Sequence, residues 1–227
     1  MLTLAALTLS SLFCSVQAHY TFPSLTGAGG VTADWEYVRQ TNNFQSNEPV
    51  IDVTSADFRC YNSMFNTTIA STLSVAAGST LGINCPLTIY HPGVVNVYMA
   101  RAPTGQDVST WAGDGAVWFK VYEITAVTDG GTTISYPAQN LPSVSFTIPS
   151  ALPSGQYLVR MEALALHLAE TFQGAQWYIS CGQISVTNGG TGTPGPLVAI
   201  PGVYTEPGIL INIYYPIPTS YTQVRSP

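Results

Sequence analysis

The sequence contains few charged side chains. Six Lys and Arg stand against twelve Asp and Glu in 227 residues, which gives a formal net charge of −6 at pH 7. Six scattered cations do not form the basic surface that binds nucleic acid, so we expect no nucleic-acid partner. Thirteen Tyr residues, with many Ser, Thr, Gly and Asn residues, instead suit an extracellular protein that meets a neutral polar partner such as a carbohydrate.

Long apolar runs are also lacking. The first eighteen residues, MLTLAALTLSSLFCSVQA, carry no charged side chain. They are too short and too rich in hydroxyl groups for a membrane span, which needs about 20 mainly apolar residues, and no later segment comes closer, so we expect no membrane partner. The stretch ends in Val16-Gln17-Ala18, which is similar to the cleavage site of a secretory leader. The sequence therefore predicts a signal peptide over residues 1–18 and a secreted, extracellular protein that begins at His19.

Residues 19–227 show no internal repeat. Their number is compatible with one all-β domain, since sandwiches often reach about 200 residues as a single unit. The segment TNGGTGTPGPL after Val186 has the composition of a linker, but too little chain follows it for a second domain. We predict a single catalytic domain over residues 19–227, with an irregular tail wrapped along it and no appended carbohydrate-binding module.

Apolar residues alternate with polar ones, with a period of two, through much of the chain. The segments STLSVAAGSTLGI (71–83) and SVSFTI (143–148) show this pattern, and AVWFKVYEI (116–124) and GQYLVRMEALAL (155–166) are longer β-branched and aromatic runs. Such segments predict strands joined by turns. Because no segment shows a sustained helical stripe, the fold class is all-β: an antiparallel β-sandwich with Ig-like or fibronectin-like architecture, long loops, and helices at most in the loops.

Cysteine is scarce, and one of the four cysteines, Cys14, lies in the predicted leader. Export permits disulfides, and the remaining Cys60, Cys85 and Cys181 allow one bridge and one leftover thiol. The residues alone do not choose the pair. Asn66-Thr67-Thr68 is a sequon, so Asn66 is a candidate for N-glycosylation.

Histidine is equally scarce, yet cleavage after Ala18 makes one of the three histidines N-terminal. His19 would then offer an α-amine, with a pKa of about 7.7–8.0, and a ring nitrogen to a metal. A second histidine, such as His91, completes a three-nitrogen site that suits copper. The alternative is that His19 is merely solvated and that His91, before Pro92-Gly93, is a turn residue.

The segment ALHLAETFQGAQWYISC (165–181) contains the third histidine. Gln176 and Tyr178 follow His167 at spacings of nine and eleven residues. If Gln176 and Tyr178 share a strand, they point to the same face, and a loop from His167 then places an imidazole, an amide and a phenol around one point. Taken singly, the tyrosine is a common core residue and the glutamine a common surface residue.

Together these features resemble the fungal lytic polysaccharide monooxygenases of auxiliary activity family 9, formerly glycoside hydrolase family 61. The resemblance runs from HYTFP through DWEYVRQT, FRCY, IYHPG and GAQWYISC to TSYT. It implies that His19 and His91 hold one copper ion per chain in a histidine brace and that Tyr178 lies at an axial position. It also implies that His167 and Gln176 hydrogen-bond to copper-bound oxygen and relay a proton.

The activity that the resemblance implies is oxidative cleavage of β-1,4-glucan chains such as cellulose. An external electron donor, either a small molecule or a redox protein, reduces the copper, and O2 or H2O2 is the co-substrate. Tyr90, directly before His91, favours oxidation at C1. Two other hypotheses remain: a secreted copper-binding protein with the same brace but no polysaccharide cleavage, and a metal-free carbohydrate-binding sandwich. We expect a monomer.

The resemblance also assigns substrate-facing residues and a disulfide. Tyr221 in TSYT matches a tyrosine of the flat substrate face, where Tyr90 lies too, whereas Gln45, beside Phe44, occupies a place that holds an aromatic ring in related sequences. The cysteines of FRCY and YISC pair in the family, which implies a Cys60–Cys181 bridge. Cys85 matches no family cysteine, and we expect it to be a buried free thiol.

Overall fold

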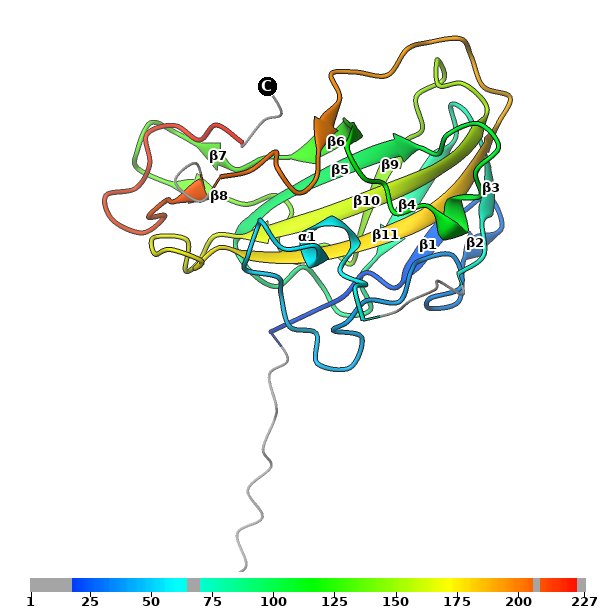
Figure 1. Cartoon of the computed structure of the whole chain (residues 1–227). Helices are drawn as coiled ribbons and strands as arrows, with labels where there is room; N and C mark the ends of the chain where they lie inside the picture. The colour runs from blue at the N-terminus through cyan, green and yellow to red at the C-terminus, as the bar shows by residue number, and fades with distance from the viewer. Residues whose placement is uncertain (1–17, 65–69, 206–208, 224–227) are drawn as a thin grey trace, which may run out of the picture.

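The computed structural model describes residues 18–64, 70–205 and 209–223 (Figure 1). Residues 1–17 of the predicted leader and the candidate glycosylation site Asn66 lie outside these ranges. Within them, no helix is both long enough and apolar enough to cross a bilayer.

Two sheets form the body of the described chain (Figure 1). The large sheet has the strand order β12-β6-β5-β10-β11-β3 and the small sheet has the order β2-β1-β4-β9. In chain order the strands are β1 Ser24–Gly27, β2 Gly30–Val31, β3 Leu73–Ala76, β4 Thr80–Asn84, β5 Gly93–Arg101, β6 Ala116–Ile124, β7 Val127–Thr128, β8 Ile134–Ser135, β9 Ser143–Thr147, β10 Gly155–Ala165, β11 Gln176–Thr187 and β12 Val198–Ala199. The helical elements are α1, Asp57–Cys60, and a 3-10 turn, η1, Val108–Thr110. The all-β sandwich that the alternation predicts is thus confirmed.

The central strands of the large sheet are buried on both faces. Along β10, Tyr157, Val159 and Met161 face the core between the two sheets. The residues between them, such as Leu158, face a second core on the opposite side of the large sheet. Because successive side chains of a strand point to opposite faces, this double burial explains why the segment is a nearly continuous apolar run.

One pairing differs from the expected antiparallel pattern. β3 pairs in parallel with β11, with Val75 opposite Val186, so the large sheet is mixed. Although β3 and β4 are joined by a tight turn at Gly78, which has a φ of 81°, they belong to different sheets. The turn carries the chain from the large sheet to the small sheet. The alternation of apolar and polar residues on either side of the turn does not indicate this change of sheet.

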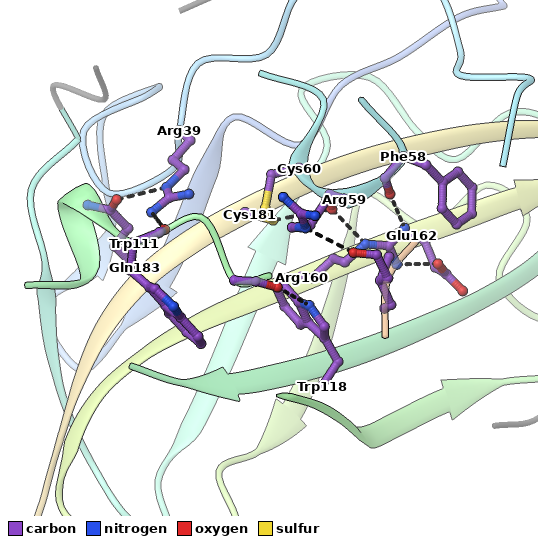
Figure 2. Close-up of a disulfide and its surroundings, with 12 residues drawn as sticks. Arg39, Phe58, Arg59, Cys60, Trp111, Trp118, Arg160, Glu162, Cys181 and Gln183 are labelled. Atoms are coloured by element: carbon purple, nitrogen blue, oxygen red, sulfur yellow. Dashed lines mark hydrogen bonds and ion pairs between the residues drawn. A yellow bond between two sulfur atoms is a disulfide. The ribbon is translucent and has the colours of Figure 1, made fainter. Parts of the chain in front are cut away.

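The second core lies beneath α1, the loops and the tail. It contains a buried ion pair between Arg160 and Glu162, and both side chains are 0% exposed (Figure 2). Nε and Nη2 of Arg160 donate to the carbonyl oxygens of Arg59 and Phe58 at 2.7 and 2.8 Å. Glu162 also accepts hydrogen bonds from the Tyr204 hydroxyl and from Nδ2 of Asn96. The large sheet therefore holds α1 by charge-assisted bonds to its last carbonyls.

A disulfide joins Cys60, at the end of α1, to Cys181 on β11, 121 residues further along the chain (Figure 2). This is the pair that the family resemblance implies. Together with the Arg160 contacts, the bridge fixes α1 over the strand that also carries Tyr178. Cys85 is the free cysteine of the described chain, and it is buried.

We predict that Cys85 is unreactive in the folded protein. Burial raises the pKa of its thiol to about 11, and the thiolate is the reactive form. A maleimide should therefore label the native chain at pH 8 very slowly and label the denaturant-unfolded chain fully, as mass spectrometry would record. Rapid labelling of the folded chain at pH 8 would contradict the burial.

The same shift makes folding stability depend on pH. Because the folded pKa lies above the unfolded value, the contribution is fully present below about pH 9 and is lost as pH rises towards about 11. Denaturant titrations at pH 8 and pH 10 should show a smaller loss of stability for Cys85→Ala than for the natural sequence.

Candidate metal centre

Three neighbouring strands of the large sheet end at the same edge. Ala165, the last residue of β10, lies opposite both Gly93, the first residue of β5, and Gln176, the first residue of β11. His91 precedes β5 by two residues and His167 follows β10 by two residues. The ladder of hydrogen bonds therefore brings these two histidines to one point of the sheet edge, with Gln176 beside them.

The N-terminal segment before β1 brings His19 to the same point. The ring centroids of His19, His91 and Tyr178 form a triangle in which each pair is 6.0 Å apart. Tyr178 is fully buried, whereas the His19 side chain is 32% exposed. The structure thus brings together residues that are far apart in the sequence, and solvent reaches them from the His19 side.

His91 and His167 stack on each other with their ring centroids 4.0 Å apart and their planes 9° from parallel. Burial, followed by the neighbouring His167 and His19, lowers the pKa of His91 to about 4. Burial, followed by His19, also lowers the pKa of His167. Both shifts favour the neutral imidazole, which keeps a nitrogen lone pair on each ring.

Two buried ring nitrogens of this pair have no hydrogen-bond partner within the described part of the chain, Nε2 of His91 and Nδ1 of His167. Unpartnered buried polar atoms are uncommon and call for an explanation. A metal ion accepts the lone pair of a neutral imidazole, so the orphaned Nε2 of His91 fits a metal ligand.

The backbone of His19 can offer a further nitrogen to a metal ion. No group of three or more His, Cys, Asp or Glu side chains in the described ranges is arranged to hold a metal ion. Removal of Ala18 would convert the amide nitrogen of His19 into an amine, and that amine and Nδ1 of the same residue close a six-membered ring with a metal. Amine, Nδ1 and the His91 nitrogen then form a three-nitrogen set of the kind that copper prefers.

Tyr178 and Gln176 lie beside the proposed ligands on β11. The Tyr178 hydroxyl donates to Oε1 of Gln176 at 3.1 Å. Burial, with a smaller contribution from Glu48, raises the pKa of Tyr178 well above its ordinary value. The ring of Tyr20 stacks on Tyr178 with centroids 4.0 Å apart. Tyr178 is thus a rigidly packed, neutral phenol that fills one side of the site.

The two tyrosines expected to face the substrate, Tyr90 and Tyr221, differ in exposure. Tyr90 is 45% exposed, and its ring lies edge-on to His91 at 5.3 Å. Tyr221, in contrast, is half-buried and packs against the second core, and burial raises the pKa of its phenol strongly. A ring packed in this way presents little of its face to a polymer, so the geometry does not favour Tyr221 as a stacking platform.

Two tyrosines that the sequence analysis did not single out are better exposed. Tyr214 and Tyr215 are 59% and 85% exposed, and the Tyr214 hydroxyl donates to the carbonyl oxygen of His167 at 3.2 Å. The tail therefore brings the Tyr214-Tyr215 pair next to the histidines. The aromatic density of the tail was the available signal, but it does not distinguish these residues from Tyr221.

The loop that contains Gln45 lies on the His19 side of the centre. Gln45 is exposed. Its neighbour Phe44 is 38% exposed and lines an open cavity of about 280 Å³ together with Tyr20 and Trp35. In the same loop, Oε1 of Glu48 lies 3.4 Å from Nδ1 of His19. No spacing rule connects Glu48 with His19, so the sequence carried no signal for this contact.

Comparison with known proteins gives a consistent result. The profile of Auxiliary Activity family 9 (formerly GH61) matches residues 19–221. The family 9 lytic polysaccharide monooxygenase H from Malbranchea cinnamomea is 54% identical over 215 residues, which cover 94% of this chain and 93% of the relative. Monooxygenase D from Phanerodontia chrysosporium is 50% identical over 217 residues, 93% of this chain and 91% of the relative. A solved structure of a cellulose-active polysaccharide monooxygenase from M. thermophila superposes with a TM-score of 0.78 at 29% identity, covering 90% of this chain and 96% of that one.

Proposed function

The chain belongs to auxiliary activity family 9, the lytic polysaccharide monooxygenases, and on that premise we propose that it is a secreted, copper-dependent enzyme that oxidises cellulose or a related β-1,4-glucan at C1. Enzymes of this family cleave polysaccharides oxidatively and use external reductants. We propose that residues 19–227 act as one catalytic domain and as a monomer. Removal of residues 1–18 on secretion would expose the amine of His19.

The observation that carries the proposal is the triangle of His19, His91 and Tyr178, with its orphaned histidine nitrogen. Each pair of ring centroids is 6.0 Å apart, and Nε2 of His91 is buried without a partner in the described chain. In the proposed centre His19 and His91 hold the copper ion. Bound copper, reduced by the external donor, would supply the activation of O2 or H2O2 that oxidation of a C–H bond requires.

The other residues of the centre act by position and by hydrogen bonding. The phenol of Tyr178 is packed against Tyr20 and excludes water from one side of the centre. His167 and Gln176 border the centre with an imidazole and an amide, and a neutral imidazole both donates and accepts a proton. In this proposal His167 and Gln176 move or hold a proton at the reacting oxygen, on the side that stays open to solvent.

We propose that the glucan lies across the exposed rings around the centre. Tyr90 borders His91, and Tyr214 is tied to the His167 carbonyl. Aromatic side chains expose flat apolar faces that can pack on sugar rings. The M. thermophila structure is that of a cellulose-active enzyme, which supports cellulose as the substrate, and Tyr90 beside the open side supports attack at C1.

The experiment uses protein processed to begin at His19. Copper is loaded, ascorbate and amorphous cellulose are added, and products are identified by mass spectrometry. We expect aldonic acids that vanish without ascorbate and in His91→Ala. His167→Ala is the matched comparison, because it removes the other imidazole of the stacked pair and should retain copper while product formation slows by roughly 100-fold or more. Tight copper binding by the natural sequence without oxidised product would favour the copper-binding hypothesis, and ketone products of C4 attack would overturn C1 oxidation.

A further inference from the structure

A carboxylate faces the proposed centre from outside the ligand set. Oε1 of Glu48 lies 3.4 Å from Nδ1 of His19, and the Glu48 side chain is 59% exposed. Among the described residues, Glu48 carries the one carboxylate within ion-pair distance of His19, His91 or His167. Nδ1 is the ring nitrogen that can chelate a metal together with the amine of the same histidine, so this carboxylate lies next to the place where the metal would be.

The position of Glu48 is set by the backbone of its loop. Asn43 donates through Nδ2 to the carbonyl oxygen of Glu48 at 2.6 Å, and the amide of Asn47, at a φ of 59°, donates to the carbonyl of Asn43 at 2.7 Å. Two residues after Glu48, Val50 exchanges two 2.9 Å hydrogen bonds with Trp177, the neighbour of Tyr178 on β11. The loop is therefore anchored beside the centre, and none of these bonds uses the Glu48 carboxylate.

We propose that Glu48 is a positioning residue of the metal centre whose negative charge favours Cu(II) over Cu(I). The inference rests on the proposed function and names a residue that sets how readily the copper centre is reduced. A nearby anion stabilises a divalent cation more than a monovalent one, so Glu48 lowers the reduction potential of the centre. The carboxylate acts through space on the ion that His19 holds, and the nitrogen ligands remain the same.

The size of the effect follows from charge and exposure. One unit of charge, acting at about 4 Å in a medium as polar as water, changes an equilibrium about fivefold. Because Glu48 is exposed, high salt should screen the effect, since the Debye length falls from about 10 Å at 0.1 M to about 3 Å at 1 M. For a one-electron couple, in which tenfold corresponds to about 59 mV, a fivefold change is a shift of about 40 mV.

The test compares Glu48→Gln with the natural sequence, each processed to begin at His19. Cu(II) affinity is measured by competition with a chelator of known strength, and the potential by equilibrium redox titration, at about 0.05 M and 1 M salt. We expect Glu48→Gln to bind Cu(II) at least fivefold more weakly and to have a potential about 40 mV higher at low salt, with a smaller difference at high salt. Glu48→Asp keeps the charge and should retain most of the natural behaviour.

Glu123→Gln is the charge-matched control. It also removes one negative charge, but Glu123 is on β6, where it pairs with Lys120 at 3.1 Å, and it should leave the affinity and the potential unchanged. The inference is overturned if Glu48→Gln matches the natural sequence in both measurements, or if Glu123→Gln shifts both measurements equally. In either case, copper binding by the natural sequence would leave the proposed function standing. Failure of the processed natural sequence to bind copper would overturn both.

Discussion

A chain that retains Ala18 on His19 is expected to bind Cu(II) at least roughly 100-fold more weakly than a chain that begins at His19. In the longer chain the nitrogen of His19 is an amide, which does not offer a lone pair to a metal as an amine does. The chelate ring is lost, and His91 is left with a single ring nitrogen of His19 as its partner. Loss of an outer-sphere contact alone typically weakens metal binding 10- to 100-fold, so loss of an inner ligand should reach at least the upper end of that range.

Competition titrations of the two chains, produced with and without Ala18, measure this difference. Denaturant unfolding of the two copper-free chains is the control, because equal midpoints show that the added alanine leaves the fold intact. Equal Cu(II) affinities would show that the amine of His19 is not a ligand, and the copper proposal would then need a different donor set.

Glu162→Gln is expected to lower the free energy of unfolding by about 3–5 kcal/mol. The substitution leaves the guanidinium of Arg160 buried at 0% exposure without its anion, and removal of one partner of a buried ion pair typically costs this much. The weakened acceptor also disturbs the hydrogen bonds from Tyr204 and Asn96. Urea titration of the copper-free protein, followed by tryptophan fluorescence, gives the difference.

Glu123→Gln again serves as the comparison. The Lys120–Glu123 pair is partly exposed on β6, and pairs of that kind contribute about 0–1 kcal/mol. We therefore expect a loss of less than 1 kcal/mol for Glu123→Gln. Similar losses for the two variants would mean that water reaches Glu162 and that the second core is less tightly closed than the structure indicates.

Local pattern was sufficient to locate the strands with strong alternation or long apolar runs. The run predicted over 116–124 is β6, and the run predicted over 155–166 ends one residue beyond β10. The turn-forming residues Pro153-Ser154-Gly155 stand at the start of β10, and β-branched and aromatic residues fill both strands. The residue pattern and the turn residues therefore predicted the same strand boundaries.

Strand partners and the second core were not readable in the same way. The parallel pairing of β3 with β11 depends on where the chain goes after the turn at Gly78, and that direction is not written in the alternation of Leu73 and Val75. Likewise, no local pattern states that Arg160 and Glu162 point into a core, because strand charges usually face water. Their burial depends on the covering chain, which is distant in sequence.

The sequence predicted which residues form the proposed centre, but it did not predict the contacts that surround them. The position of His19 after a cleavage site and the spacing of Gln176 and Tyr178 are local signals. The strand ends bring Gln176 near His91 and His167, and the N-terminal segment adds His19. The stacking of His91 on His167 and the contact of Glu48 with His19 arise from loops that meet only in three dimensions. Which tail tyrosine is exposed, Tyr214 or Tyr221, was decided by packing against the second core.

The tail has a consequence for the resistance of the protein to proteases. It runs beside β7 and β8 (Figure 1), with Thr128 donating to the Thr219 carbonyl, and Nε2 of Gln223 donates to the β5 carbonyl of Val95 at 2.9 Å. A protease that cut between β11 and Tyr204 would spare every proposed copper-facing side chain, yet release the aromatic and aliphatic cover of the large sheet. The clipped enzyme would expose a broad apolar surface that promotes aggregation. The tail would then limit the resistance of the protein to proteases even while the residues of the proposed centre stay intact.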